Sequence, residues 1–185
     1  MLIKTFTEKD IVRVQKFTDS EIGLGYYSAE ELLENCLKSV CDDGSSSSFI
    51  LLNEDTNQVK GLRLAYPPRK WTHGKGNLLR PDLWPHPLEK SGYFQSLFIS
   101  KELQGHGYGP ALSKKSIQVL KNQSALGIAT HCWKESPHNS SVRYLEKMGF
   151  KKIIEHPLYW EKVNYLCPLD GTPCRCTAIE MYLEL

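Results

Sequence analysis

The sequence predicts one α/β domain (α+β in some schemes) that spans residues 1–185. Its 185 residues suit a single domain, because a chain of this size buries about 70% of its unfolded surface. An aromatic-rich apolar strand at 93–100 leads through a glycine-dense turn into a helix at 110–120 and a second apolar strand at 127–133. Such a unit is normally a right-handed crossover, so we expect its two strands to be parallel neighbours.

The N-terminal part is predicted to form a short strand, at 2–6, and then two helices. Residues 7–10 resemble a helix cap, and residues 28–31 (Ser-Ala-Glu-Glu) form a capping box. Helical spacing of apolar residues predicts the face that each helix buries. These faces comprise Ile11, Val14 and Phe17 in the first helix, and Leu33, Cys36, Leu37 and Val40 in the second.

The polar stretch 42–48 is interpreted as a linker within the domain, because 49–53 and 59–66 follow it as a plausible hairpin. Residues 67–92 form an unusually long connection, which contains Trp71 and Trp84. Connections longer than about 12–15 residues are uncommon unless they bind or cover something. Two interpretations stay open: an ordered wall over a binding site, and a surface loop held on the sheet by its tryptophans.

The turn Gln104–Gly109 is typical of a phosphate cradle. Glycines let the backbone approach a ligand, and the following helix offers unpaired N–H groups to an anion. A nucleotide P-loop would need Gly-Lys-Ser/Thr here, and a dinucleotide fingerprint would need G-x-G-x-x-G, whereas Gly105, Gly107 and Gly109 follow G-x-G-x-G. The spacing therefore disfavours both motifs.

The pattern Q/R-x-x-G-x-G/A is met by Gln104, Gly107 and Gly109, and with it the chain resembles the GNAT superfamily of acyl-CoA-dependent N-acetyltransferases. Ile99 lies five residues before Gln104, where that family ends its central strand with a small aliphatic residue. A second match is Ser141–Phe150, which is similar to the family's helix that closes on Gly-Phe. The detailed resemblance covers residues 93–150.

This resemblance implies a mixed, centrally splayed sheet of about seven strands with about four helices, and acetyl-CoA as cosubstrate. The strands of the crossover would separate, and backbone groups of Leu97, Phe98 and Ile99 would bind the pantetheine arm. Ser140 and Ser141 are interpreted first as helix-capping residues and second as contacts to the cofactor. Backbone N–H groups would bind the pyrophosphate along the turn Gln104, Gly105, His106, Gly107, Tyr108 and Gly109. The alternative is that Leu97 and Ile99 are core residues and the glycines only turn the chain.

The implied reaction is attack of an amine on an acetyl thioester. Deprotonating a lysine-like amine at pH 7 costs about 4.6 kcal/mol, so a proton acceptor is valuable. The chain departs from the family here, with Tyr93 at the position of a common glutamate and Leu145 at that of a common tyrosine. Tyr144, one residue earlier, is the candidate acid. His131 and His138 are candidate bases, and the alternative for each is a structural or surface histidine.

Three cysteines lie close together in the C-terminal part, in a predicted hairpin at 167–176. Cys174 and Cys176, two apart on a strand, would face one point with Cys167 opposite them. They could hold zinc if a fourth ligand such as His156 joined, but the motif lacks a paired C-x-x-C. We expect free thiols and no metal. Cys36, Cys41 and Cys132 are expected to be small core residues.

The sequence thus predicts an N-acyltransferase that moves an acetyl group from acetyl-CoA to an amine acceptor. The alternatives are a different acyl chain or acceptor, and a CoA-binding regulatory module that has lost its acid and base. With 23 basic and 21 acidic residues, the charge gives no sign of nucleic-acid binding, and no apolar run predicts a membrane helix. We expect a cytoplasmic monomer or homodimer. The resemblance implies that 19–28, with Tyr26 and Tyr27, and the loop 67–92 select the acceptor.

Overall fold

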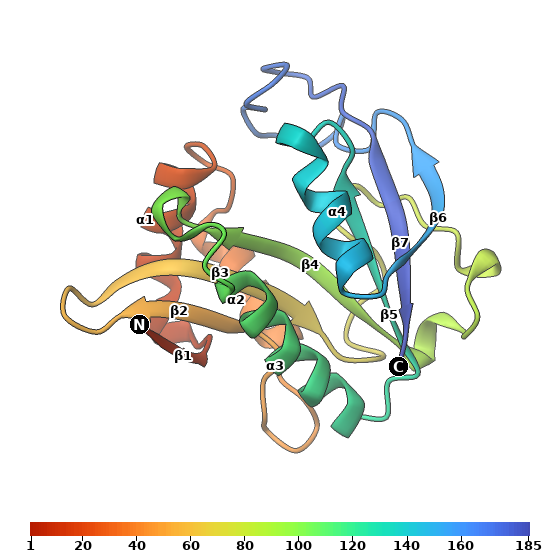
Figure 1. Ribbon diagram of the computed structural model, residues 1–185, viewed down its shortest axis with the longest axis horizontal. Helices are drawn as coiled ribbons and strands as arrows, with labels where there is room; N and C mark the ends of the chain where they lie inside the picture. Colours follow the sequence, from red (N-terminus) through yellow and green to blue (C-terminus); the bar gives the residue numbers. More distant parts are fainter.

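A seven-stranded mixed sheet forms the centre of the computed structural model, which describes residues 1–185 (Figure 1). The strand order is β1-β2-β3-β4-β5-β7-β6, and β4 with β5 is the parallel pair among antiparallel neighbours. The strands are β1 (Leu2–Thr5), β2 (Phe49–Asn53), β3 (Gln58–Tyr66), β4 (Ser91–Ile99), β5 (Gly127–Trp133), β6 (Lys151–His156) and β7 (Ala178–Glu184). The helices are α1 (Ile11–Glu21), α2 (Ala29–Lys38), α3 (Tyr108–Asn122) and α4 (Ser140–Lys147). The predicted fold class is confirmed.

The two parallel strands of the crossover separate along their length. Pairing runs from Ser91 with Gly127 to Phe94 with Thr130 and then stops, although β4 continues to Ile99 and β5 to Trp133. Figure 1 shows the two strands diverging toward their C-terminal ends, with α3 connecting them. An opening therefore lies in the middle of the sheet, as the sequence predicted.

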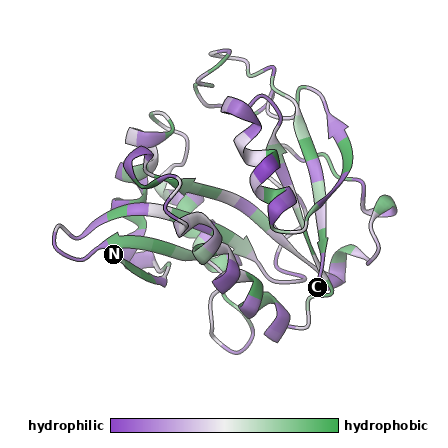
Figure 2. Cartoon of the chain, viewed as in Figure 1, coloured by the Kyte–Doolittle hydropathy of each residue, from purple (hydrophilic) through white to green (hydrophobic).

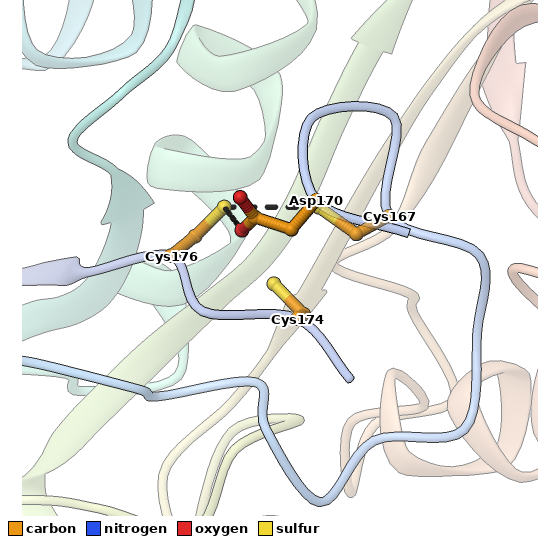
Figure 3. A group of neighbouring side chains, drawn as sticks. All are labelled: Cys167, Asp170, Cys174 and Cys176. Atoms are coloured by element: carbon orange, nitrogen blue, oxygen red, sulfur yellow. Dashed lines mark hydrogen bonds between the residues drawn. The ribbon is translucent and has the colours of Figure 1, made fainter. Parts of the chain in front are cut away.

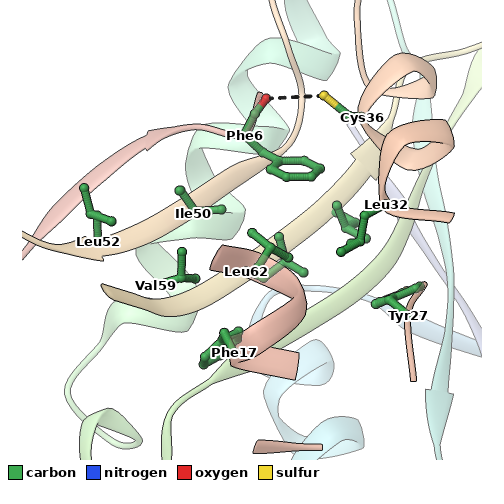
Figure 4. Packing of buried hydrophobic residues seen from close by; sticks show 11 residues of the cluster. Phe6, Phe17, Tyr27, Leu32, Cys36, Ile50, Leu52, Val59 and Leu62 are labelled. Carbon is green, nitrogen blue, oxygen red and sulfur yellow. Dashed lines mark hydrogen bonds between the residues drawn. The ribbon is translucent and has the colours of Figure 1, made fainter. Parts of the chain in front are cut away.

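The helices cover the two faces of the sheet unequally. On one face, α1 and α2 pack on β2 and β3 around a cluster that includes Phe17, Leu32 and Leu62 (Figure 4). On the other face, α3 and α4 cover a cluster that includes Phe94, Leu120 and Leu145. Figure 2 shows apolar residues concentrated along the strands and polar residues on the outer sides of the helices. No helix combines the length and the hydropathy needed to span a membrane.

The predicted buried face of the second helix was wrong in part. Cys36 is buried as expected, but its partner one turn earlier is Leu32, which is fully buried. Leu33 and Leu37 are 38% and 56% exposed, and Val40 lies beyond the end of the helix. The apolar residues of this segment form two adjacent stripes, and periodicity alone cannot tell which stripe faces the sheet.

Two long connections cover the part of the sheet where no helix packs. Residues 67–90 place Trp71 and Trp84 against Tyr93 and Tyr182, and the Trp71 indole donates to the Ser91 carbonyl at 2.9 Å. Residues 157–177 form the second connection. Cys174 and Cys176 lie in this irregular segment and not on a strand, because β7 begins only at Ala178. The three cysteines nevertheless meet at one point, as predicted, although no paired strand carries Cys174 and Cys176.

Candidate active site

A cleft with a volume of about 1270 Å³ occupies the opening between β4 and β5. Both motifs singled out in the sequence reach it, the glycine-rich turn from one end and α4 from the side. The α1–α2 connection and residues 159–169 form the rest of its wall. The residues expected to act here that line it are Tyr144, His131, Leu97, Phe98, Ile99, Gln104, Gly105, Gly107, Tyr108, Gly109 and Ser141.

The glycine-rich turn presents unpaired backbone donors at the start of α3. Gly105 and Gly107 have φ angles of +81° and +83°, which side-chain-bearing residues rarely adopt. The N–H groups of Gly105, Gly107, Tyr108 and Gly109 have no partner in the protein, whereas those of Gln104 and His106 bond to the carbonyls of Lys101 and Leu103. The donors together with the positive end of the α3 dipole fit a bound pyrophosphate.

Along β4, backbone groups directed toward β3 alternate with groups directed toward the cleft, and the Ile99 carbonyl accepts from Gln104 Nε2 at 3.1 Å. Ser100 donates its N–H to Lys60, so the ladder with β3 also engages Phe98, two residues earlier. Leu97 and Ile99 consequently direct their backbone groups away from β3 and into the cleft. This geometry fits a pantetheine arm that bonds to the backbone of Leu97 and Ile99. The Phe98 side chain lies on the face of the sheet that α1 and α2 cover, where it contacts Tyr26.

Tyr144 projects from α4 toward the first turns of α3. Its hydroxyl donates to Ser113 Oγ at 2.5 Å and lies 3.3 Å from the guanidinium of Arg63. Arg63 is 2% exposed, has no carboxylate partner, and stacks over the Phe94 ring at 4.1 Å. Burial lowers the pKa of Arg63, but an arginine remains charged at neutral pH. A buried positive charge therefore faces the Tyr144 hydroxyl.

His131 lies on β5 at the opposite face of the sheet, in a chain of polar side chains. Its Nδ1 is 2.9 Å from the Tyr93 hydroxyl, and its ring stacks on Tyr159 at 4.4 Å. Nε2 lies 3.3 Å from Glu180 in a geometry that is poor for a hydrogen bond. Burial lowers the pKa of His131 in spite of the opposing effect of Glu180, so the imidazole is neutral at pH 7 and able to accept a proton.

Glu180 is the fully buried acid at the centre of this group. Its carboxylate accepts from Trp84 Nε1 at 2.5 Å, from His156 Nε2 at 2.7 Å and from the Arg80 N–H at 3.1 Å. Burial raises the pKa of Glu180, but the hydrogen bonds outweigh burial and the net shift is downward. His131, His156 and Glu180 lie close enough to share a cation. The three donors already on the carboxylate favour a hydrogen-bonded cluster instead.

The start of α4 positions the remaining residues that the sequence analysis considered. His138 is exposed, is absent from the cleft wall, and adopts φ +54° just before α4. Leu145 is 5% exposed and packs in the core beneath α4, which explains why its neighbour Tyr144 is the residue turned toward α3. Ser141 receives its cap from Ser136, whose Oγ accepts the Ser141 N–H at 3.2 Å.

The part of the cleft wall that Tyr26, Phe98 and Tyr159 form is aromatic. Tyr26 from the α1–α2 connection contacts Phe98 edge-on at 5.5 Å, and Tyr159 closes the opposite side. Lys75 reaches the wall from the long loop, where it donates to the Tyr26 carbonyl at 2.8 Å and pairs with Glu31. Tyr159 Oη is buried without a hydrogen-bond partner. Both interpretations of the 67–92 loop thus hold, because tryptophans fix it while Lys75 lines the cleft.

Sequence reasoning missed Arg63, Glu180 and Tyr159. Arg63 and Glu180 each interrupt a largely apolar strand, and a charge in such a position is a signal of a buried polar contact. Nothing in the sequence places Glu180 beside His131, because antiparallel pairing of β5 and β7 brings them together across 49 residues. Tyr159 lies in an irregular segment with no periodicity to orient it.

Comparisons with known proteins agree with this geometry. A model of the acetyltransferase (GNAT) family matches residues 19–150. Among solved structures, the ribosomal-protein-S18-alanine N-acetyltransferase from Escherichia coli is similar with a TM-score of 0.68 at 13% identity, over 99% of this chain and 92% of that one. Chaetomium thermophilum Naa20, in complex with a bisubstrate analogue, is similar with a TM-score of 0.71 at 13% identity, over 100% of this chain and 87% of that one. The NatC complex bound to Gag peptide and CoA is similar with a TM-score of 0.67 at 15% identity, over 100% of this chain and 98% of the matched chain. No curated protein sequence matches significantly.

Proposed function

The chain belongs to the GNAT family of acetyltransferases, with acetyl-CoA as cosubstrate, and we propose that it acetylates the α-amine of a peptide or protein chain. The main support for a catalytic role is the opening between β4 and β5. The four unpaired N–H groups at the start of α3 and the polar cluster around His131 line the same cleft in this opening. This arrangement supports anion binding and proton transfer within one cleft.

His131 is the proposed proton acceptor, acting through Tyr93. In the tautomer that carries its proton on Nε2, the side near Glu180, the Nδ1 lone pair accepts the Tyr93 hydroxyl proton at 2.9 Å. Tyr93 in turn accepts a proton from the attacking amine. Burial raises the pKa of Tyr93, which keeps its hydroxyl protonated and suits it to relay a proton. Tyr93 thus occupies the position of the family's glutamate without replacing it as a base.

Tyr144 is the proposed acid, which protonates the departing thiolate. Its hydroxyl already has a positive neighbour in Arg63, and Ser113 fixes its orientation. A guanidinium without a carboxylate partner also stabilises negative charge that develops nearby, which assists departure of a thiolate. Acid and base then act from opposite faces of the sheet on groups that meet in the opening.

Two arguments favour an α-amine as the acceptor. A buried histidine with a lowered pKa is a weak base, and it suits an α-amine with a pKa of about 7.7–8.0 better than a lysine amine near 10.4. In addition, the similar structures include enzymes named for ribosomal-protein alanine acetylation and a complex with a peptide. The unpartnered Tyr159 hydroxyl at the aromatic end of the cleft supplies a hydrogen bond for such an acceptor.

Thiol release from acetyl-CoA, measured over an acceptor panel, tests this function. The panel contains peptides with a free N-terminus, the same peptides blocked at the N-terminus but carrying lysine, and polyamines. We expect turnover with the first group and mass addition of one acetyl at the α-amine. Turnover only with the second or third group would overturn the α-amine assignment. Binding of CoA without thiol release from any amine would favour the regulatory module.

A further inference from the structure

The structure brings three cysteines and one aspartate of the 157–177 segment to a single point, away from the proposed acid and base. Ligand atoms of Cys167, Asp170, Cys174 and Cys176 all lie within 4.8 Å of one another. In Figure 3 the side chains of Cys174 and Cys176 point toward the Asp170 and Cys167 side chains across a common space. The three cysteines are buried and free of disulfides. His156, the fourth ligand considered from the sequence, lies instead against Glu180.

From this arrangement we propose a structural zinc site with Cys167, Cys174, Cys176 and Asp170 as its four ligands. It revises the expectation of three free thiols and no metal. Thiolates and carboxylates are ordinary zinc ligands, and a site in which the protein supplies all four is closed to substrate. The metal takes no chemical part in the proposed acetyl transfer, so zinc binding can be measured without relying on that function.

Distances within the cluster match a tetrahedral zinc centre. With zinc–sulfur bonds of about 2.3 Å, two thiolates of one tetrahedron lie about 3.8 Å apart, and a thiolate and a carboxylate oxygen about 3.5 Å. The Cys167 and Cys176 sulfurs are 3.7 Å apart, and Asp170 Oδ2 is 3.3 Å from the Cys176 sulfur. A disulfide between Cys167 and Cys176 would require a sulfur–sulfur distance of about 2.05 Å. It would also not account for the positions of Cys174 and Asp170 beside them.

The local backbone supports ligation by the first two residues. Cys167 and Gly171 exchange two backbone hydrogen bonds of 3.0 Å, which closes a tight turn around Asp170. The Cys167-x-x-Asp170 spacing is the one that paired zinc ligands commonly use.

Further donors surround the ligands, as is usual at metal sites. The Tyr165 hydroxyl donates to the Cys174 sulfur at 3.2 Å, and the Arg175 N–H donates to Asp170 Oδ2 at 2.9 Å. Such contacts orient metal ligands and offset their negative charge. Asp170, the exposed member of the group, closes the buried cysteines on the solvent side, and its Oδ2 also lies within reach of the Cys176 thiol.

The zinc site would stabilise the wall of the cleft. Residues 157–177 contain no helix or named strand, and an irregular segment of this length needs a constraint to stay ordered. Tyr165 contacts Tyr26 edge-on at 5.3 Å, and Leu169 lines the cleft. The metal would therefore fix the side of the cleft that meets the α1–α2 connection, where the acceptor is proposed to bind.

Elemental analysis of the full-length protein, purified without a histidine tag or chelator, tests the site. We expect about one zinc per chain, with release on chelation and a lower melting temperature that added zinc restores. Cys174→Ser and Cys176→Ser should each lose the metal. Cys41→Ser, a buried cysteine outside the cluster, is the matched control and should retain it. Asp170→Cys should keep zinc, whereas Asp170→Ala should bind it at least about tenfold more weakly.

Three outcomes would overturn the proposal. One is parental protein with zinc far below one per chain that also binds none under reducing conditions. A second is a Cys167–Cys176 disulfide in freshly purified protein, found by peptide mass with and without reduction. The third is equal zinc content in Cys174→Ser and the parent, which would mark the metal as adventitious. Cobalt substitution adds a readout that does not depend on stability, because a tetrahedral thiolate site gives sulfur-to-cobalt charge-transfer bands.

Discussion

In the proposed mechanism, the side chain that donates a proton and the side chains that accept one lie on opposite faces of the sheet. Tyr144 and Arg63 act on the α3–α4 face, and Tyr93 and His131 act on the face covered by the long loop. The division follows from strand alternation, because neighbouring residues of a strand point to opposite faces. Each side can therefore be tested without disturbing the other.

Replacing Tyr144 with phenylalanine tests the acid. The ring and its packing remain and only the hydroxyl is removed, so stability should change by less than about 1.5 kcal/mol. We expect kcat to fall roughly ten- to a thousand-fold with CoA affinity nearly unchanged, because the thiolate loses its proton donor. Steady-state kinetics and calorimetry measure the two quantities. Parental kcat in a folded variant would remove Tyr144 from the mechanism.

The His131 side chain should determine the pH dependence of the reaction. Its pKa is lowered by burial, so neutral His131 persists below pH 6.5, and the contribution of this base to activity is lost as the pH falls through the lowered value. With an α-amine substrate, the slope of log kcat/KM against pH should steepen from about one to about two below that point. In His131→Gln the slope should stay near one, and kcat should fall by roughly a hundred-fold or more.

His138→Gln is the comparison variant, because the exposed imidazole of His138 lies outside the cleft wall. It should keep the parental pH profile and rate. A parental profile in His131→Gln together with a changed one in His138→Gln would exchange the two assignments and move the base to the start of α4.

At the scale of elements, the start of α3 and the long loop form two separate parts of the cleft wall. The α3 turn offers its N–H groups because two of its glycines adopt left-handed conformations. The loop 67–90 is held by tryptophan stacking and by the Lys75–Glu31 pair. Cofactor binding and acceptor binding should consequently respond to different substitutions.

Gly107→Glu should abolish CoA binding. It adds a carboxylate where a phosphate must approach, at a backbone with φ +83°. We expect CoA affinity to fall by roughly 100-fold or more, about 2.7 kcal/mol, by calorimetry. Gly44→Glu is the matched control, since Gly44 has φ +80°, open surroundings and no place in the cleft. Both variants carry similar backbone strain, so only repulsion of the phosphate should separate them. Equal CoA affinity in the two would refute the cradle.

Gly74→Ala should disturb the acceptor end. A Cβ at this position would lie 2.0 Å from the Tyr93 hydroxyl and 2.6 Å from the Tyr159 hydroxyl, so the loop or the tyrosines must move. We expect a stability loss of about 1–3 kcal/mol and reduced kcat/KM for the acceptor, with CoA affinity unchanged. Thermal unfolding and kinetics measure these effects. Parental behaviour in both would show that the loop does not constrain the tyrosine pair.

At the scale of the whole molecule, one sheet connects every layer. All seven strands are hydrogen-bonded in series, although β4 and β5 share only the first part of their length. Pairing between β4 and β5 stops at the opening, so a ligand that bridges its two sides should stabilise the molecule. We expect the chain to unfold as a single domain.

Calorimetric unfolding with and without CoA tests this expectation. A single transition should rise by about 5–10 °C at 100 times the dissociation constant, since ligand binding at that concentration adds about 2.7 kcal/mol. Gly107→Glu should show the transition without the rise. Two separate transitions in the free protein would indicate that the halves on either side of the opening unfold independently.

The sequence by itself determined the crossover, the order of helices and strands, and the glycine-rich turn before α3. These features are local, since glycine conformations, helix caps and apolar periodicity act over a few residues, and the motif of Gln104, Gly107 and Gly109 lies within one turn. Tyr144 could also be identified locally, as the tyrosine of the motif-bearing helix.

Only the tertiary structure decided which polar groups meet. Glu180 reaches His131 through the pairing of β5 with β7, Arg63 reaches Tyr144 from β3, and Asp170 takes the place considered for His156 beside the three cysteines. The choice between the two apolar stripes of α2 depended on packing in the same way. These contacts depend on strand register and chain reversal over tens of residues, and periodicity carries no information on either.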